Sequence, residues 1–411
     1  GSEMCIRDRN RSIRGFNQEN IQDMNRTLLL NLLRKEGICA RAHLANLSQL
    51  KQATVTNIVS DFIDWGLVKE VGFLVGNKGR RSIGISINND DFGVLAIRLA
   101  RKNYTVGIFN LSGRLLDKKR VELDVNQPPR VTFEAIIHEA GELIRSSESR
   151  KIIAIGMAIP GPYSEKRGRI ELMTGVLGWN EIPIQEKLQD IFKIPVFLEQ
   201  DANAGALAQY WHNDEDYKNG VVVYIAVGQG VGAGIINNGE LLKGCIGVAG
   251  EVGHTSICYN GPRCACGNYG CLENYCSSIA FTKEVNRVLR PEIEYNFRQV
   301  SQLLRDGDQV VTDIFLDACD KLSVGIVNII NSFNPSVIVI GDEMSHILPS
   351  VMLERVKSNV KERVLPEIYA NMNITMSVVS NDSMAHGAAI VAINDIFNHP
   401  LTYFESNQRD D

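Results

Sequence analysis

The sequence predicts a mixed α/β protein in two parts, with a winged helix-turn-helix over residues 11–88 and a bilobed α/β body after it. Three observations support this prediction. Three helical apolar patterns precede a hairpin pattern near the N-terminus, the same order of strands and helices then occurs twice, and soft metal ligands cluster in the second copy. A length of 411 residues also fits two or three separate cores.

The N-terminal part is predicted to contain three helices and a hairpin. The first helix spans residues 21–35, with an apolar face formed by Ile21, Met24, Leu28 and Leu32. Short helices follow at residues 41–47 and 52–65. Strands at residues 67–74 and 82–87 then flank a glycine-rich tip. This order is typical of a winged helix-turn-helix, whose last helix enters a DNA groove.

The body alternates strands and helices in two similar halves. In the first half we expect strands at 94–99, 105–110, 114–123 and 152–158, with a helix at 131–146. In the second half we expect strands at 221–227, 232–237 and 336–340. Two α/β halves indicate two lobes with a cleft between them. We assign residues 92–205 and a C-terminal helix at 384–397 to the first lobe, and residues 206–383 to the second.

Charge and hydropathy exclude a general polyanion binder and a membrane protein. The net charge of −5 is not that of a general polyanion binder, so a nucleic-acid surface has to be local. Basic residues do cluster within positions 1–90. No apolar run approaches 18 residues, so we expect no membrane contact and a cytoplasmic location.

Four soft metal ligands lie within eighteen residues: His254, Cys264, Cys266 and Cys271. Three thiolates and one imidazole complete a tetrahedral Zn²⁺ site with no open position, which is typical of structural zinc. The nine cysteines of the chain are not spread along it as in a disulfide framework, and their clustering favours a metal site. The alternative is a set of buried or free cysteines beside an unrelated histidine.

The residues around these ligands form a longer motif. It runs Glu251-x-Gly253-His254, then Cys264-x-Cys266-Gly267-x-x-Gly270-Cys271-x-Glu273. With this motif the chain resembles the ROK family of sugar kinases and repressors. The resemblance extends to the glycine loop at 228–234 and to Asn334-Pro335. It implies an actin-like (ribonuclease H-like), sugar kinase-type body, and it implies a repressor because the family's kinases lack the winged helix.

The resemblance also implies roles for individual residues. Glu251, His254 and Glu273 occupy positions that contact sugar hydroxyls in this family, with His254 offering one ring nitrogen to zinc and the other to the sugar. Asp201 lies where the family's kinases keep the catalytic base, so here it is a vestigial base and a sugar contact. Gln200 replaces the usual asparagine beside it and joins the sugar contacts.

Departures from the kinase pattern indicate that phosphoryl transfer is lost. The kinases begin the body with Asp-x-Gly-Gly-Thr, which approaches phosphates and helps to place Mg²⁺. This chain has Arg98-Leu99-Ala100-Arg101-Lys102 there. The second phosphate loop has Gln229 in place of its threonine. We therefore expect no enzyme activity.

The third helix and the wing supply the expected DNA contacts. These are Lys51, Gln52, Thr54, Thr56 and Asn57 at the start of the helix, with Arg80 and Arg81 at the wing. The alternative is an ordinary solvated helix and a charged hairpin. Ala40 and Lys51 stand where the family commonly has a serine or threonine helix cap, which leaves the bases that are read open.

Taken together, the sequence predicts a sugar-responsive repressor. We expect a homodimer or a dimer of dimers on a palindromic duplex operator, released by an unphosphorylated sugar inducer. One alternative is an ATP-dependent sugar kinase with an appended DNA-binding domain. A second is a sugar-independent regulator controlled by a protein partner.

Overall fold

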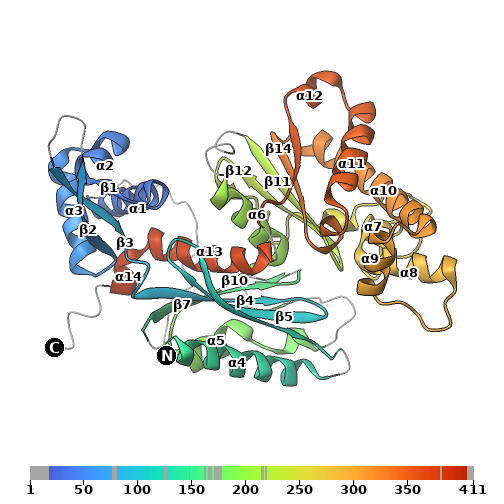
Figure 1. Cartoon of the computed structure of the whole chain (residues 1–411), viewed down its shortest axis with the longest axis horizontal. Helices are drawn as coiled ribbons and strands as arrows, with labels where there is room; N and C mark the ends of the chain where they lie inside the picture. Colours follow the sequence, from blue (N-terminus) through green and yellow to red (C-terminus); the bar gives the residue numbers. More distant parts are fainter. Residues whose placement is uncertain are drawn as a thin grey trace. The chain divides into compact units, whose positions relative to one another are not determined.

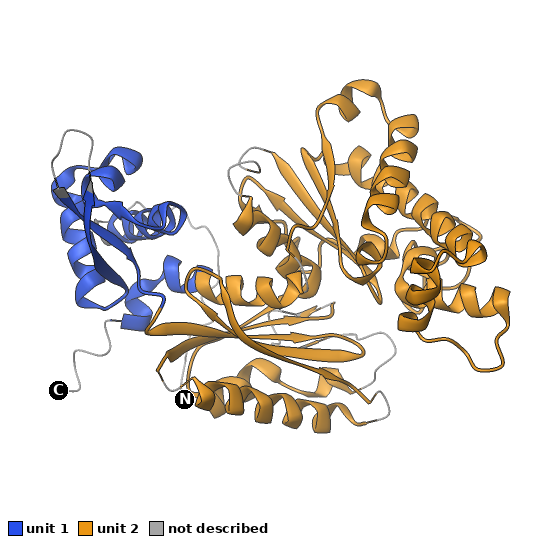
Figure 2. Cartoon of the chain, in the orientation of Figure 1, with its two compact units in different colours: residues 1–89, 394–411 blue, residues 90–393 orange. Residues whose placement is uncertain are grey.

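The computed structural model describes residues 18–75, 81–124, 127–147, 149–161, 163–164, 169–170, 178–213, 217, 220–379 and 382–404. They fall into two compact units (Figure 2). Unit 1 takes in residues 1–89 and 394–411, and unit 2 takes in residues 90–393. Within the described ranges, no helix is both long enough and apolar enough to cross a bilayer.

Unit 1 contains the predicted winged helix-turn-helix (Figure 1). Its elements are α1 (Gln18–Glu36), β1 (Cys39–Ala40), α2 (Arg41–Ser48), α3 (Gln52–Asp64), β2 (Val68–Val75) and β3 (Arg81–Ile87). The three strands pair antiparallel in the order β1-β3-β2. Neither Ala40 before α2 nor Lys51 before α3 caps its helix through a side chain, as their residue types predict.

The buried face of α1 differs from the predicted one. Ile21, Met24 and Leu28 are 49%, 58% and 39% exposed, whereas Leu29 and Leu30 are fully buried. The helix has two apolar stripes, and helical spacing alone does not say which of them faces the core. The buried stripe also includes Leu33. Apolar residues of α2 and α3 are buried as well, namely Leu44, Val55, Ile58 and Phe62.

The end of the chain returns to unit 1. Helix α13 (Ser383–Asn398) is followed by α14 (Pro400–Phe404). The buried ring of Phe404 stacks on Trp65, with centroids 6.5 Å apart and planes 7° apart. The Thr27 hydroxyl donates to the Phe397 carbonyl at 3.2 Å. The C-terminal helix that we assigned to the first lobe is therefore divided, and from Asn394 onward it groups with unit 1.

Unit 2 is built on two five-stranded sheets of the same design. The first has the order β10-β7-β4-β5-β6 and the second the order β13-β12-β11-β14-β15. In each sheet three antiparallel strands are extended by two parallel ones. This is the duplication that the sequence predicts. The bounds are β4 (Phe92–Leu99), β5 (Asn103–Asn110), β6 (Leu115–Glu122), β7 (Lys151–Ile159), β10 (Val196–Gln200), β11 (Val221–Val227), β12 (Val231–Asn237), β13 (Glu240–Leu241), β14 (Val337–Gly341) and β15 (Asn373–Met376).

Helices pack against both sheets. Helices α4 (Pro129–Ser146) and α5 (Ile184–Phe192) pack on the first sheet, whereas α6 (Asp201–His212) packs mainly on β11 and β12 of the second. The second half has α7 (Glu273–Cys276), α8 (Ser278–Leu289), α9 (Phe297–Arg305), α10 (Gln309–Phe333), α11 (Pro349–Arg363) and α12 (Pro366–Ala370). Short elements complete the unit: β8 (Tyr163–Ser164), β9 (Arg169–Ile170), and the 3-10 turns η1 (Trp179–Glu181), η2 (Val252–His254) and η3 (Glu343–His346). Each sheet and its helices enclose a separate apolar core.

Candidate functional site

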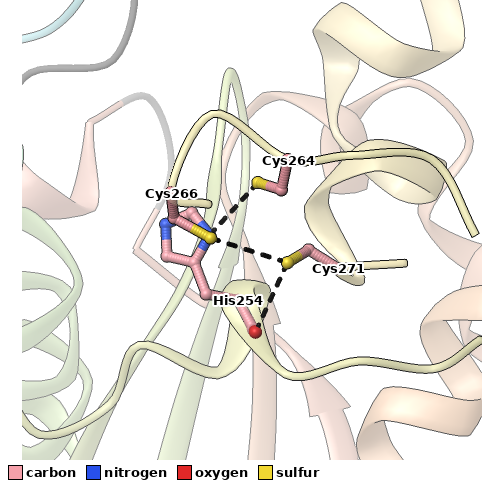
Figure 3. A group of neighbouring side chains, drawn as sticks. All are labelled: His254, Cys264, Cys266 and Cys271. Carbon is pink, nitrogen blue, oxygen red and sulfur yellow. Dashed lines mark hydrogen bonds between the residues drawn. The ribbon is translucent and has the colours of Figure 1, made fainter. Parts of the chain in front are cut away.

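One histidine and three cysteines gather on the loop between η2 and α7 (Figure 3). His254 ends η2, and the three cysteines follow in the loop. The His254 Nδ1 atom lies 3.7 Å from the Cys264 Sγ atom, and the Cys266 and Cys271 Sγ atoms are also 3.7 Å apart. The donor atoms of all four residues lie within 4.8 Å of one another. The four residues that the sequence groups as ligands are thus neighbours in space.

These separations suit a tetrahedral metal site. Two thiolates bound to one ion at about 2.3 Å each lie about 3.8 Å apart, close to the distances above. Nitrogen and sulfur are the donors that soft and borderline transition metals prefer. The cluster can therefore hold a metal ion. With four protein donors and no open position, the metal would have a structural role.

Two glycines hold the segment before the cluster directly against strand β12. A Cβ atom at Gly250 would lie 1.9 Å from the Ala233 carbonyl oxygen, and one at Gly253 would lie 2.0 Å from the Val231 carbonyl oxygen. Real Cβ atoms do not come so close, so only glycine allows this contact. This close packing fixes the backbone of Glu251, which lies between the two glycines in the sequence.

A cavity of about 230 Å³ opens in unit 2, lined by residues that follow strands of both sheets. The five residues predicted to contact sugar all line it: Gln200, Asp201, Glu251, His254 and Glu273. They come from four places in the fold, namely the end of β10, the first residue of α6, the turn η2 with the residue before it, and the first residue of α7. The structure therefore brings together residues that lie up to 73 positions apart.

Hydrogen bonds orient these polar side chains. The Gln200 amide nitrogen donates to Glu251 at 2.5 Å, and the His254 Nε2 atom lies 3.8 Å from the other Glu251 oxygen. The Val231 amide donates to Glu273 at 3.0 Å. His254 thus presents Nδ1 to the thiols and Nε2 to the cavity side, so that one ring belongs to both sites.

The acid in the middle of the cavity has a shifted pKa. Burial raises the pKa of Asp201 to about 6, Arg98 opposes the shift, and Asp342 adds to it. The Asp201 carboxylate also accepts a hydrogen bond from the Ala202 amide at 2.7 Å. An acid with such a pKa accepts hydroxyl protons more readily than an exposed aspartate does.

Charged side chains of the protein itself line the part of the cavity beside the glycine loop at 228–234. The Arg98 guanidinium lies 2.9 Å from Asp382 and 3.4 Å from Asp342. Arg101 donates to the Gln229 carbonyl at 3.2 Å. A Cβ atom at Gly228 would lie 2.0 Å from the Asp342 carboxylate. The glycine loop therefore faces carboxylates and guanidinium groups of the protein itself.

The residues predicted to contact DNA are accessible on helix α3 of unit 1. Lys51, Gln52, Thr56 and Asn57 are exposed and Thr54 is half-buried. The Thr56 hydroxyl donates to the Gln52 carbonyl at 2.9 Å. Of the two wing arginines, Arg80 lies outside the described residues. Only the backbone of Arg81, at the start of β3, lies inside them.

Sequence reasoning missed Asp342, Asp382 and Arg101, which line the same cavity. The available signal was weak. Asp342 and Glu343 directly follow the buried strand β14, a position that often carries functional side chains in α/β folds, but nothing links them to Arg98 in the sequence.

Comparison with known proteins gives a consistent result. Residues 94–395 match the ROK family. The xylose repressor of Caldicellulosiruptor bescii is 27% identical over 393 residues, which cover 92% of this chain and 98% of that protein.

Two solved structures are similar as well. A ROK family transcriptional regulator, described as a homolog of the E. coli MLC protein, aligns with a TM-score of 0.78 and 26% identity over 93% of this chain and 98% of that one. A ROK hexokinase from Thermus thermophilus aligns with a TM-score of 0.61 and 27% identity over 74% of this chain and 99% of that one. The repressor and the regulator match nearly the whole chain, whereas the hexokinase matches about three quarters of it.

Proposed function

Because this chain belongs to the ROK family, we propose that it is a sugar-responsive transcriptional repressor. One observation carries the proposal. A winged helix-turn-helix precedes a cavity lined by all five predicted sugar contacts, and arginine and aspartate side chains occupy the other half of that cavity. The similarity of the whole chain to a xylose repressor supports this combination of a DNA reader and a sugar pocket.

The proposed ligand is an unphosphorylated sugar, read mainly by hydrogen-bond acceptors. Glu251, Asp201 and Glu273 offer carboxylate oxygens to sugar hydroxyls. The Gln200 carbonyl oxygen is buried and has no hydrogen-bond partner among the residues that the structure describes. A buried acceptor without a partner costs free energy. A sugar hydroxyl that donates to it would remove this cost, and sugar binding would become more favourable.

The proposed metal is one structural Zn²⁺ per chain, bound by His254, Cys264, Cys266 and Cys271. Metal ligation at Nδ1 would fix the tautomer of His254 and direct Nε2 toward the sugar. Zinc would then shape the sugar pocket and take no part in chemistry.

For DNA, we propose that α3 reads a major groove and that the wing contacts an adjacent minor groove. The helix contacts would be Lys51, Gln52, Thr54, Thr56 and Asn57, and the wing contacts Arg80 and Arg81. A homodimer or a dimer of dimers would place two such helices on a palindromic operator. Sugar can release the protein from its operator only if it binds the DNA-incompetent arrangement of the protein more tightly than the DNA-bound arrangement.

A sugar kinase is the second candidate function. It is favoured by Asp201, whose pKa of about 6 suits a base, and by the similarity to a hexokinase over three quarters of the chain. It is opposed by Arg98, which lies where the resemblance places an aspartate of the kinases and pairs with two carboxylates.

We expect about one Zn²⁺ per chain by elemental analysis. Cys266→Ser should lose the metal and weaken both thermal stability and sugar binding, because three donors hold zinc less tightly than four. Cys245→Ser, an exposed cysteine outside the cluster, is the matched control and should keep both. A metal-free protein with a Cys264–Cys271 disulfide in reducing buffer would contradict the zinc site.

Glu251→Gln should produce a super-repressor. The substitution keeps the size of the side chain and removes its charge, which should weaken sugar binding by about 1.5–3 kcal/mol. Calorimetry should show the weaker binding, and the variant should occupy its operator yet stay bound when sugar is added. The control is Glu292→Gln, at an exposed loop position. Loss of operator binding together with the sugar response would mean that Glu251 supports folding and not the sugar.

The wing and helix α3 should contribute separately to DNA binding. Replacing Arg80 and Arg81 with alanine should weaken binding to every duplex and flatten its salt dependence, since guanidinium groups supply electrostatic affinity. Asn57→Ala should cost about 1–3 kcal/mol on the operator and little on scrambled DNA. Titrations on both duplexes at several salt concentrations separate these effects. Ser60→Ala, also exposed on α3, serves as the control. If all variants bind both duplexes as the parent does, unit 1 is not the DNA reader.

The protein should not phosphorylate sugars. A coupled assay with ATP, Mg²⁺ and a panel of aldoses and N-acetylhexosamines should show no turnover above background, because Arg98 and Gln229 replace groups that place Mg²⁺ and phosphate in the kinases. Turnover near ~1 per second, ordinary for an enzyme, would make the kinase the correct function.

A further inference from the structure

Arg98 is a buried charge between carboxylates from distant parts of unit 2. It extends from β4 in the first sheet, whereas Asp342 follows β14 in the second sheet and Asp382 precedes α13. The three side chains are only 12%, 16% and 9% exposed. A charge so far from water persists only where opposite charges compensate it. The guanidinium therefore joins the two halves of the cavity.

The acidic groups around Arg98 are held in place by other contacts. The Thr105 hydroxyl donates to Asp382 at 2.9 Å, and the Ala385 amide donates to the same carboxylate at 3.1 Å. Asp342 has a φ of 73°, a left-handed conformation that is costly for a residue with a side chain. Hydrogen bonds thus hold the Asp382 carboxylate directly, and the Ser345 hydroxyl, which donates to the Asp342 carbonyl at 2.7 Å, holds Asp342 through its main chain.

Negative charge exceeds positive charge at this point. Asp201 lies near enough to interact electrostatically with Arg98, and Asp382 and Asp342 keep the pKa of Arg98 raised even though burial opposes its charge. A second arginine of the cavity, Arg101, lies 3.8 Å from Glu273. Removal of the Arg98 charge would therefore leave fixed, buried oxygen ligands with no cation.

We propose that Arg98 is a resident cation, whose guanidinium occupies a latent divalent-cation site formed by Asp342 and Asp382 and fastens the two halves of the cavity together. The cavity then needs no inorganic cation to keep these carboxylates together. This role goes beyond sugar and DNA binding, and it holds whether or not either of them occurs. A consequence is that a neutral side chain at position 98 uncovers a site for hard cations, which prefer carboxylate oxygens.

The test compares two side chains of similar length at position 98 in the full chain, purified with its own metal and without chelator. Arg98→Met removes the charge, and Arg98→Lys keeps it. Melting is followed in 0 and 10 mM MgCl₂ or CaCl₂ at constant ionic strength. We expect Arg98→Met to melt about 5–8 °C below the parent, since a buried charge network has lost its cation. Either salt should return about 2 °C or more of that loss.

Either salt should change the melting temperature by less than about 1 °C in the parent, in Arg98→Lys and in the control Arg101→Met. In all three proteins, Asp342 and Asp382 keep a cation between them. Equal stability of the lysine and methionine variants would show that Arg98 acts by packing alone, and would overturn the proposal. So would a response of Arg98→Met to the salts no larger than that of Arg101→Met.

A charge-balance variant covers the case in which Arg98→Met is not recovered folded. Arg98→Met combined with Asp382→Asn removes one positive and one negative group. It should be recovered soluble and folded where Arg98→Met alone is not, because less buried charge is left uncompensated. A double variant no better than the single one would contradict the proposal as well.

Discussion

The backbone at Gly250 and Gly253 packs directly against strand β12, with no room for a side chain at either glycine. The candidate site around the cavity depends on this contact. At Gly250 and Gly253 the backbone lies against carbonyl oxygens of the strand, and the Ala233 amide donates to the Gly250 carbonyl at 2.8 Å. Glu251 and His254 are consequently positioned by a sheet edge and not by a free loop. The cysteine loop continues from this anchored segment, so that the cluster of His254 and three cysteines and the cavity share one base.

Electrostatics divides the cavity into two halves with different roles. In one half, acceptors such as the Glu251 carboxylate line the cavity, which suits a neutral ligand rich in hydroxyl groups. In the other half, Arg98 and the aspartates that face it satisfy one another. The cavity thus combines acceptors for a hydroxyl-rich ligand with an arginine and two aspartates that pair with one another.

Local patterns predicted most of this site because its ligands are close in the chain. His254 and the three cysteines lie within eighteen residues, and the motif around them includes Glu251 and Glu273. The partners of Arg98 could not be found in this way. Asp342 and Asp382 lie 244 and 284 positions away, and a single aspartate in a sequence looks the same whether it is buried beside a guanidinium or exposed to water. The prediction of the buried face of α1 was wrong for a related reason. Two apolar stripes on this helix have the same period, and only the packed core distinguishes them.

Residues 394–404 pack with the N-terminal helices in one compact unit, and this has a practical meaning for domain exchange. Trp65 stacks on Phe404, and the Thr27 hydroxyl donates to the Phe397 carbonyl, so unit 1 takes part of its structure from residues 394–404. A chimera that grafts residues 1–89 onto a different sensor would leave Trp65 without its stacking partner. The transplantable module is discontinuous, and a working graft has to carry the C-terminal residues from 394 to 404 with it.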